Sequence, residues 1–134
     1  MPFSVRVLPG RRLIWAEGSG AVTDQDLEDY VREYLEEGDL RHYDEFMDLS
    51  NADLLDLTYR GLTRVAETAA ATDPDSGPTR IALLVSEPLG VGLSRMYQSL
   101  RESRGGKRLV RVFYRAADVR DWLDLPPDWA SREG

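Results

Sequence analysis

Residues 81–85 form an unbroken run of five apolar side chains, Ile-Ala-Leu-Leu-Val, between two polar segments. A run this short and continuous is typical of a central strand in a parallel sheet, because such a strand is covered on both of its faces. The segments on either side of it show the apolar spacing of amphipathic helices. A buried strand between two helices restricts the chain to an α/β fold.

The other predicted elements alternate in the same way. Residues 4–8 and 13–17 predict an antiparallel hairpin around a turn at Pro9 and Gly10, and glycines 18 and 20 are expected to end its second strand. Further strands are predicted at 43–49, 81–85 and 109–114. Thr23 and Asp26 predict a capping box at the start of the first helix, and Gly38 is expected to end it as a left-handed C′ residue. The spacing predicts further helices over 57–70, from Pro88 to glycines 105 and 106, and over 116–123.

The resulting order is β-β-α-β-α-β-α-β-α, which predicts a mixed, mainly parallel sheet of about five strands with helices packed on it. A chain of 134 residues fits one domain. We expect this domain to span residues 1–125 and to be followed by a C-terminal tail over residues 126–134. The aromatic side chain of Trp129 is a candidate for packing of the tail on the domain. Residues 72–79, with Asp-Pro and Gly-Pro pairs, predict a loop.

The composition argues against most catalytic chemistry. The chain has no cysteine and one histidine, His42, which argues against thiolate nucleophiles, disulfides and Cys- or His-rich metal sites. No Gly-x-Ser-x-Gly segment is present, so no serine hydrolase is predicted. We therefore expect no enzyme activity, no metal and no cofactor. The absence of a long apolar run or an apolar leader predicts a cytoplasmic protein.

The charge is unevenly distributed. The net charge is −7, and residues 1–50 carry 5 basic and 12 acidic groups. Residues 95–115 hold seven basic groups against the single acid Glu102. The acidic total argues against nucleic-acid binding. The basic segment is interpreted first as a solvated face and second as a patch for a headgroup, a nucleotide or an acidic partner. Pairing of acidic and basic segments between two copies makes a homodimer plausible.

Two polar motifs have competing interpretations. Asp48, Asp53 and Asp56 fall in one segment after a strand, where carboxylates hold Mg²⁺ or Ca²⁺ or form turns and caps; the turn interpretation is favoured. Gly90 and Gly92 open a helix after a strand as a phosphate loop would. Because the third glycine and the Gly-Lys-Ser/Thr pattern are missing, helix–sheet packing is the favoured role.

Two longer stretches carry a family resemblance. Residues 80–97, RIALLVSEPLGVGLSRMY, resemble the central strand and helix of the SpoIIAA-like family, a bacterial group with the STAS and CRAL-TRIO-like fold. Residues 112–123, VFYRAADVRDWL, are similar to its closing strand and helix, and Gly18 with Val22 and Thr23 is similar to its opening. The resemblance implies a small mixed sheet, no known reaction, and the binding of a lipophilic ligand, a membrane or a protein partner.

We therefore expect a non-enzymatic domain that binds a lipophilic or amphiphilic small molecule or an anionic membrane surface. The pocket would lie between the second and third helices and the sheet, where small residues of one helix face apolar residues of the next. Its predicted lining is Leu62, Leu89, Leu93, Arg95, Met96 and Tyr97, with Arg95 placed to meet an acidic headgroup.

The alternative is a protein-partner module. Residues 48–58, DLSNADLLDLT, are similar to the strand and loop of anti-sigma-factor antagonists, in which an Asp precedes a phosphorylated Ser at a helix start. Here Thr58 follows Asp56 by two positions. In this interpretation Asp56 and Thr58 form a phosphorylation switch that regulates contact with a protein partner.

Overall fold

The computed structural model describes residues 2–73, 79–103 and 107–129. Predictions for residues 74–78 and for glycines 105 and 106 lie outside these ranges. Five strands and four α-helices occur in the predicted β-β-α-β-α-β-α-β-α order, with a 3-10 turn η1 after β1 and a π-helical segment η2 after α1. Their bounds are β1 Phe3–Leu8, η1 Pro9–Arg11, β2 Leu13–Ala21, α1 Asp24–Tyr30, η2 Val31–Glu37, β3 Asp44–Asp53, α2 Tyr59–Ala70, β4 Arg80–Leu84, α3 Pro88–Ser103, β5 Leu109–Phe113 and α4 Ala116–Trp122.

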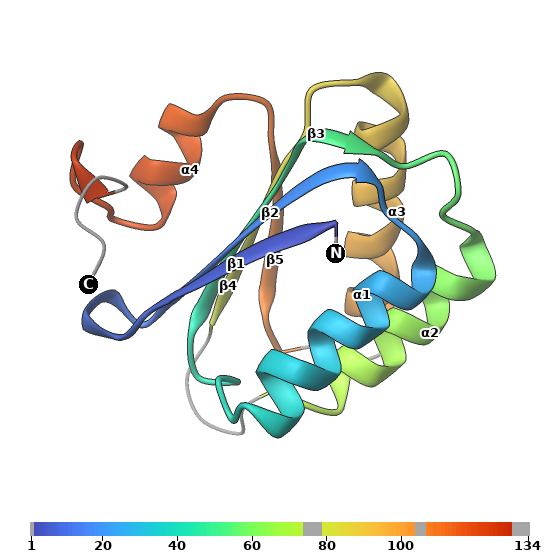
Figure 1. Cartoon of the computed structure of the whole chain (residues 1–134), viewed down its shortest axis with the longest axis horizontal. Helices are drawn as coiled ribbons and strands as arrows, with labels where there is room; N and C mark the ends of the chain where they lie inside the picture. The colour runs from blue at the N-terminus through green and yellow to red at the C-terminus, as the bar shows by residue number, and fades with distance from the viewer. Residues whose placement is uncertain (1, 74–78, 104–106, 130–134) are drawn as a thin grey trace.

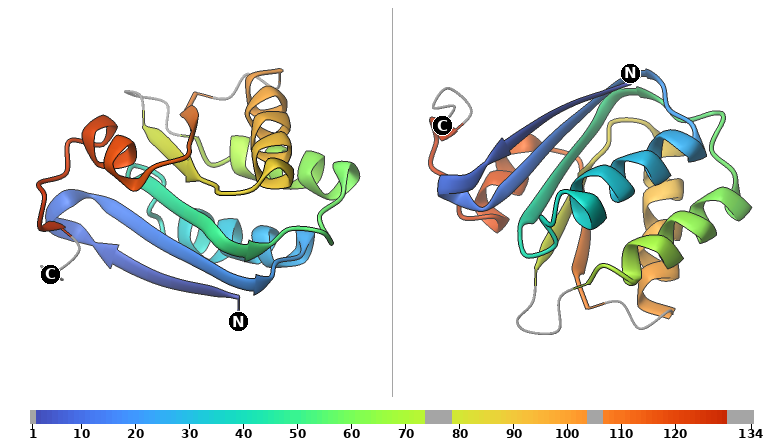
Figure 2. Two further views of the ribbon diagram at one scale, coloured as in Figure 1. Left: turned by 90° about the horizontal axis from the view of Figure 1, so that it is seen from above. Right: turned by 60° about the horizontal axis from the view of Figure 1, so that its bottom comes forward.

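The sheet is mixed and its strands lie in sequence order, β1-β2-β3-β4-β5. β1 and β2 pair antiparallel, and the remaining pairs are parallel. Figure 2 shows this progression from the blue hairpin to the orange β5. Because every parallel crossover moves one strand in the same direction, right-handed connections place α1, α2 and α3 on one face. Figure 1 shows these three helices on one side of the sheet and α4 on the other.

The central strands alternate between two apolar cores. Ile81 and Leu83 of β4 point to the face of α1, α2 and α3, whereas Ala82 and Leu84 pack with α4. In β3, Met47 belongs to the first core and Phe46 to the second. Both faces of these strands are therefore covered, which accounts for the continuous apolar run over residues 81–85.

Two strands are longer than the sequence predicts. The glycines at 18 and 20 do not end β2, because its parallel pairing with β3 continues to Ala21 and Asp53. The register shifts between Glu17 and Ser19, as expected for a β-bulge in a glycine-containing strand. β3 likewise continues through residues 50–53, where a loop was expected.

The end of the first helix also differs from expectation. Thr23 and Asp26 form the predicted capping box, in which the Thr23 hydroxyl accepts from the Asp26 backbone N–H at 3.2 Å. Gly38 is not left-handed, however, since its φ is −75°. A Cβ at position 38 would meet the carbonyl oxygen of Glu33 at 2.8 Å, so the close approach of the π-helical end favours glycine there.

Trp129, in the expected tail, is 8% exposed and packs on the sheet face that carries α4. Its ring centroid lies 4.5 Å from that of Trp15 and 5.7 Å from that of Phe46. The start of the tail is therefore part of the second core. Aromatic contacts of this kind stabilise a core beyond the area that they bury.

Gly61 should be more sensitive to substitution than Gly92. The Asp24 carboxylate accepts from the Thr58 backbone N–H at 3.1 Å and from its hydroxyl at 2.6 Å, and Thr58 in turn caps α2 by accepting from the Gly61 N–H. A Cβ at Gly61 would meet the Asp24 carboxyl carbon at 1.9 Å, whereas one at Gly92 meets nothing within 4 Å.

We expect Gly61→Ala to lower the free energy of unfolding by about 1–2 kcal/mol through loss of this cap. Gly92→Ala, the control, should raise it by about 0.5–1 kcal/mol because alanine favours the helix. Urea unfolding of both variants measures the difference. Equal effects of the two substitutions would contradict the capping role of Asp24.

Candidate functional site

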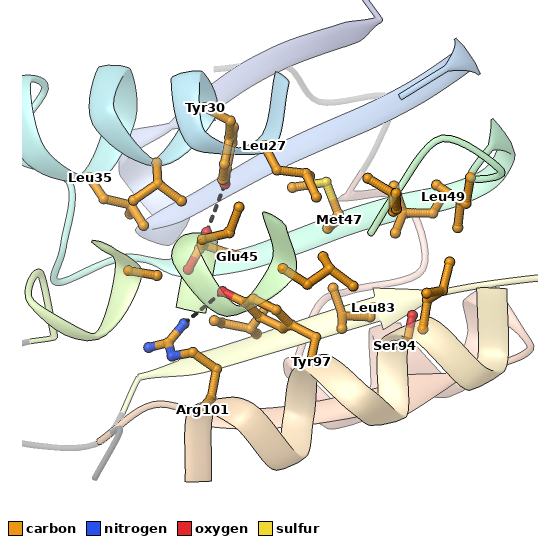
Figure 3. A pocket seen from close by; sticks show the side chains of 18 residues that line it. Leu27, Tyr30, Leu35, Glu45, Met47, Leu49, Leu83, Ser94, Tyr97 and Arg101 are labelled. Atoms are coloured by element: carbon orange, nitrogen blue, oxygen red, sulfur yellow. Dashed lines mark hydrogen bonds between the residues drawn. The ribbon is translucent and has the colours of Figure 1, made fainter. Parts of the chain in front are cut away.

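A cavity of about 70 Å³ lies between α1, α2, α3 and the sheet. One water needs about 10–15 Å³ by this measure, so the cavity has room for a molecule of about five heavy atoms. Its walls are predominantly apolar side chains from both layers, among them Leu27, Val31, Met47, Leu62, Val65, Ala69, Leu83 and Leu93. Figure 3 shows that Tyr30, Glu45, Tyr97 and Arg101 gather toward one end, with Leu49 and Ser94 toward the other.

Two arginines and two carboxylates form a buried ion-pair cluster at the polar end. Glu45 Oε2 lies 3.1 Å from Arg108 Nη1, and their side chains are 4% and 0% exposed. Asp73 Oδ1 lies 2.5 Å from Arg101 Nη2 and 3.4 Å from Arg108 Nε. Two positive and two negative charges therefore face one another, and we refer to Glu45, Asp73, Arg101 and Arg108 as the buried quartet.

Two tyrosine hydroxyls extend the buried quartet into the cavity. Tyr30 donates to Glu45 Oε1 at 2.8 Å. Arg101 Nη1 donates to the Tyr97 hydroxyl oxygen at 3.1 Å. Burial, followed by the negative charge of Glu45, raises the pKa of Tyr30 well above its usual value. Burial also raises the pKa of Tyr97, so both phenols are protonated at neutral pH.

Backbone groups and Tyr97 hold the quartet in position. Arg108 Nη1 donates to the Tyr43 carbonyl at 2.9 Å, and Arg108 Nη2 donates to the Arg41 carbonyl. The Lys107 N–H donates to Asp73 Oδ2 at 2.8 Å. For Arg101, burial acts to lower the pKa, but Tyr97 and Asp73 outweigh it and the net shift is upward. The Arg101 guanidinium therefore stays charged inside the fold.

The outer boundary of the cavity lies at the carboxyl ends of the parallel strands. Leu49 and Leu54 line both the cavity and a cleft between the β3–α2 and β4–α3 connections. Leu54 is 5% exposed, and it is in contact range of a Cβ at Gly90. The carboxyl edge is the usual ligand side of a parallel sheet. Leu49 and Leu54 thus separate the cavity from solvent at this edge.

Three of the six residues predicted to line a pocket are in the cavity wall: Leu62, Leu93 and Tyr97. Met96 instead packs with Leu62 in the contact between α2 and α3. Leu89 is 43% exposed and lines the outer cleft. Arg95 is exposed and donates to the Tyr114 hydroxyl at 2.9 Å. A binding role for these residues stays a prediction.

The other candidate residues lie in β3, in the turn after it and at the start of α2. Asp56 is exposed, and Thr58 is the N-cap of α2. Asp48 lies within β3 and accepts from the Ser50 N–H and hydroxyl. Asp53, the last residue of β3, accepts from the Leu55 N–H in the turn that follows. Within the described ranges, no three His, Asp or Glu side chains are arranged to hold a metal ion, and no helix is long and apolar enough to cross a membrane.

Sequence reasoning missed the buried quartet. The interpretation of residues 95–115 as a solvated face is wrong for Arg101 and Arg108, which are 1% and 4% exposed. Two signals were present. Arg101 continues the apolar stripe of α3 four residues after Tyr97, and Glu45 shares a strand face with Met47. A charged residue on a buried face requires a partner, which periodicity does not identify.

Removing one member of the quartet should be far more costly than removing an exposed charge. We expect Arg108→Met to lower the free energy of unfolding by about 3–5 kcal/mol, because Glu45 is then left buried without its cation. Adding Glu45→Met should restore most of this loss. Arg32→Met, which removes an exposed partner of Asp29, should cost less than about 1 kcal/mol. Chemical denaturation measures the wild type and these three variants. A double variant that is no more stable than Arg108→Met would contradict the pairing.

Stability should also fall at alkaline pH. Because the pKa of Tyr30 is raised in the folded state, the folded chain keeps a proton that the unfolded chain releases above about pH 10. The free energy of unfolding should then decrease by up to about 1.4 kcal/mol per pH unit for this group, and be unaffected below pH 10. Denaturant unfolding between pH 8 and 11 should show a shallower decrease for Tyr30→Phe. Tyr59→Phe, at an exposed position, should show the same pH dependence of the free energy of unfolding as the wild type. Identical slopes for the two variants would contradict the role of Tyr30.

The comparisons with known proteins give no family assignment. The chain matches no protein-family model, no curated protein and no solved structure. A functional proposal must therefore be argued from the geometry of the site. This site consists of an apolar cavity, a charge-balanced polar end and a boundary of two leucines at the carboxyl edge of the sheet.

Proposed function

We propose that this chain is a non-enzymatic binding domain that holds a small lipophilic or amphiphilic molecule in the cavity between its three-helix layer and its sheet. The cavity carries this proposal, because it combines an apolar wall with polar groups concentrated at one end. Binding sites for small molecules commonly have this composition. Membership of the SpoIIAA-like family, with a STAS or CRAL-TRIO-like fold, is part of the proposal and is supported by the element order.

The size of the cavity limits the ligand. About 70 Å³ accommodates a compact molecule and not a long acyl chain. Access would run through the outer cleft, where Leu49 and Leu54 form the boundary. Displacement of these two side chains would join the cleft and the cavity without disturbing the buried quartet at the other end.

An anionic membrane surface is a poorer fit to the same edge. Leu55 and Leu89 are exposed there, at 76% and 43%, but Asp53, Asp56 and Glu87 are exposed in the same two connections. Carboxylates beside the apolar side chains repel anionic lipid. The cavity is therefore the better supported site.

The regulatory module remains a second proposal because of the surface around Thr58. Leu55 and Tyr59 are 76% and 64% exposed and would suit a protein partner. The site expected for a phosphate is already occupied, however, by the Asp24 carboxylate, which hydrogen-bonds the Thr58 hydroxyl and backbone N–H. Phosphorylation of Thr58 would require α1 to release this contact, since two anions would otherwise meet at the start of α2.

Filling the cavity should abolish binding. We expect cyclopentane, used as an apolar probe, to produce saturable shifts of the Met47, Leu83 and Ser94 amide signals in ¹⁵N-labelled wild-type protein. Ala69 lines the cavity and is 1% exposed, so Ala69→Met should weaken this binding at least about tenfold by occupying the space.

Ala70→Met is the matched control, because Ala70 is the next residue of α2 and does not line the cavity. It should bind cyclopentane like the wild type. The proposal is contradicted if the probe shifts only exposed residues such as Leu55 and Leu89, or if Ala69→Met binds as well as Ala70→Met.

A further inference from the structure

The polar end of the cavity contains hydrogen-bond donors that no described residue uses. Arg101 is 1% exposed and lines the cavity, and its Nε–H has no acceptor among the described residues. The Tyr97 hydroxyl accepts from Arg101 at 3.1 Å, and no described group accepts its proton.

Donors in this environment favour a ligand that accepts hydrogen bonds. A buried N–H or O–H without a partner loses its interaction with water and gains nothing in return. A ligand oxygen near Arg101 and Tyr97 would restore those interactions. Glu45 Oε2 also has no hydrogen bond, although it lies 3.1 Å from Arg108 Nη1 in an ion pair. An acceptor such as a carbonyl oxygen would use the donors of Arg101 and Tyr97, and a purely hydrocarbon ligand would leave them unused.

The charge balance of the buried quartet restricts this acceptor further. Glu45 and Asp73 already compensate Arg108 and Arg101 at distances between 2.5 and 3.4 Å. A carboxylate or phosphate in the cavity would add a negative charge that no further cation lining it compensates, among the residues that the structure describes. Burying an uncompensated charge is strongly unfavourable, whereas a neutral carbonyl adds none.

The opposite end of the cavity specifies the remainder of the molecule. Leu49, Leu54 and Leu83 supply hydrocarbon surface there, beside Ser94. In Figure 3, Leu49 lies at the end of the cavity remote from Arg101. A ligand that fits both ends of the cavity has a hydrogen-bond acceptor at one end and hydrocarbon over the rest of the molecule.

We infer that the cavity selects a small, electrically neutral carbonyl compound, such as a ketone, an aldehyde or an ester, because unused donors of Arg101 and Tyr97 lie beside a charge-balanced cluster at one end of an apolar cavity. This inference rests on the proposed function, since it names the ligand class of the same cavity. The carbonyl oxygen lies toward Arg101 and Tyr97, and the hydrocarbon lies toward Leu49.

Three probes of similar size separate this inference from the proposed function: cyclopentanone, cyclopentane and cyclopropanecarboxylate. Each is titrated into the ¹⁵N-labelled full chain at neutral pH, and dissociation constants are taken from amide shifts at Met47, Leu83 and Ser94. We expect cyclopentanone to bind about tenfold more tightly than cyclopentane, as for one or two hydrogen bonds. Cyclopropanecarboxylate should bind at least about tenfold more weakly than cyclopentanone.

Each of the other outcomes overturns a specific part of the inference or of the proposed function. Equal binding of cyclopentanone and cyclopentane overturns the role of the donors and leaves the cavity proposal standing. If cyclopropanecarboxylate binds as tightly as cyclopentanone, the selection for a neutral ligand is overturned, and the proposal that the cavity binds small molecules still stands. Failure of all three probes to shift the cavity signals overturns the inference and the proposed function together.

A conservative variant tests the donor itself. Tyr97→Phe keeps the ring and removes the hydroxyl, so the preference for cyclopentanone over cyclopentane should fall about three- to tenfold while cyclopentane binding is unchanged. Tyr59→Phe, at an exposed position on α2, should leave both constants unchanged. An undiminished preference in Tyr97→Phe, with the amide spectrum of a folded protein, would overturn the assignment of Tyr97.

Discussion

The buried quartet is the interaction on which the arrangement of this protein depends. Arg108 precedes β5, Glu45 belongs to β3, Asp73 follows α2, and Arg101 lies near the end of α3. Their ion pairs therefore join four distant segments at the amino ends of the parallel strands. Each charge would be highly unfavourable in this position without its partner, so the loss of one member destabilises the segments that the quartet joins. This mutual requirement aligns α2 and α3 with the sheet.

The cavity follows from the same arrangement. Glu45 and Arg101 of the quartet line one end of the space between the helices and the sheet, together with Tyr30 and Tyr97, and apolar side chains line most of the rest. Side chains that pair with one another across this end are held in fixed directions, so they cannot collapse to fill the space beside them. The result is a permanent polar end facing an apolar interior, with Leu49 and Leu54 at the far boundary. We regard this asymmetry as the feature most relevant to function.

Local patterns predicted most of the fold but little of the site. The apolar run at 81–85 predicted a strand covered on both faces, and Thr23 with Asp26 predicted a capping box; both are confirmed. The glycines at 18 and 20 misled because strand length there depends on pairing with β3, which is remote in sequence. Burial of Arg101 and Arg108 was missed for the same reason, since their partners Asp73 and Glu45 lie on other elements. Periodicity reports which face a residue occupies and not which residue it meets.

Intermolecular nuclear Overhauser effects between cyclopentanone and the ¹³C,¹⁵N-labelled protein test the central claim most directly, because they report where the probe lies and how it is oriented. The account predicts contacts from the ring protons of the probe to the methyl groups of Leu49, Leu54 and Leu83. It also predicts a shift of the Arg101 Nε–H signal as the ketone oxygen accepts from it. Contacts confined to the exposed Leu55 and Leu89, with the Arg101 signal unmoved, would contradict it.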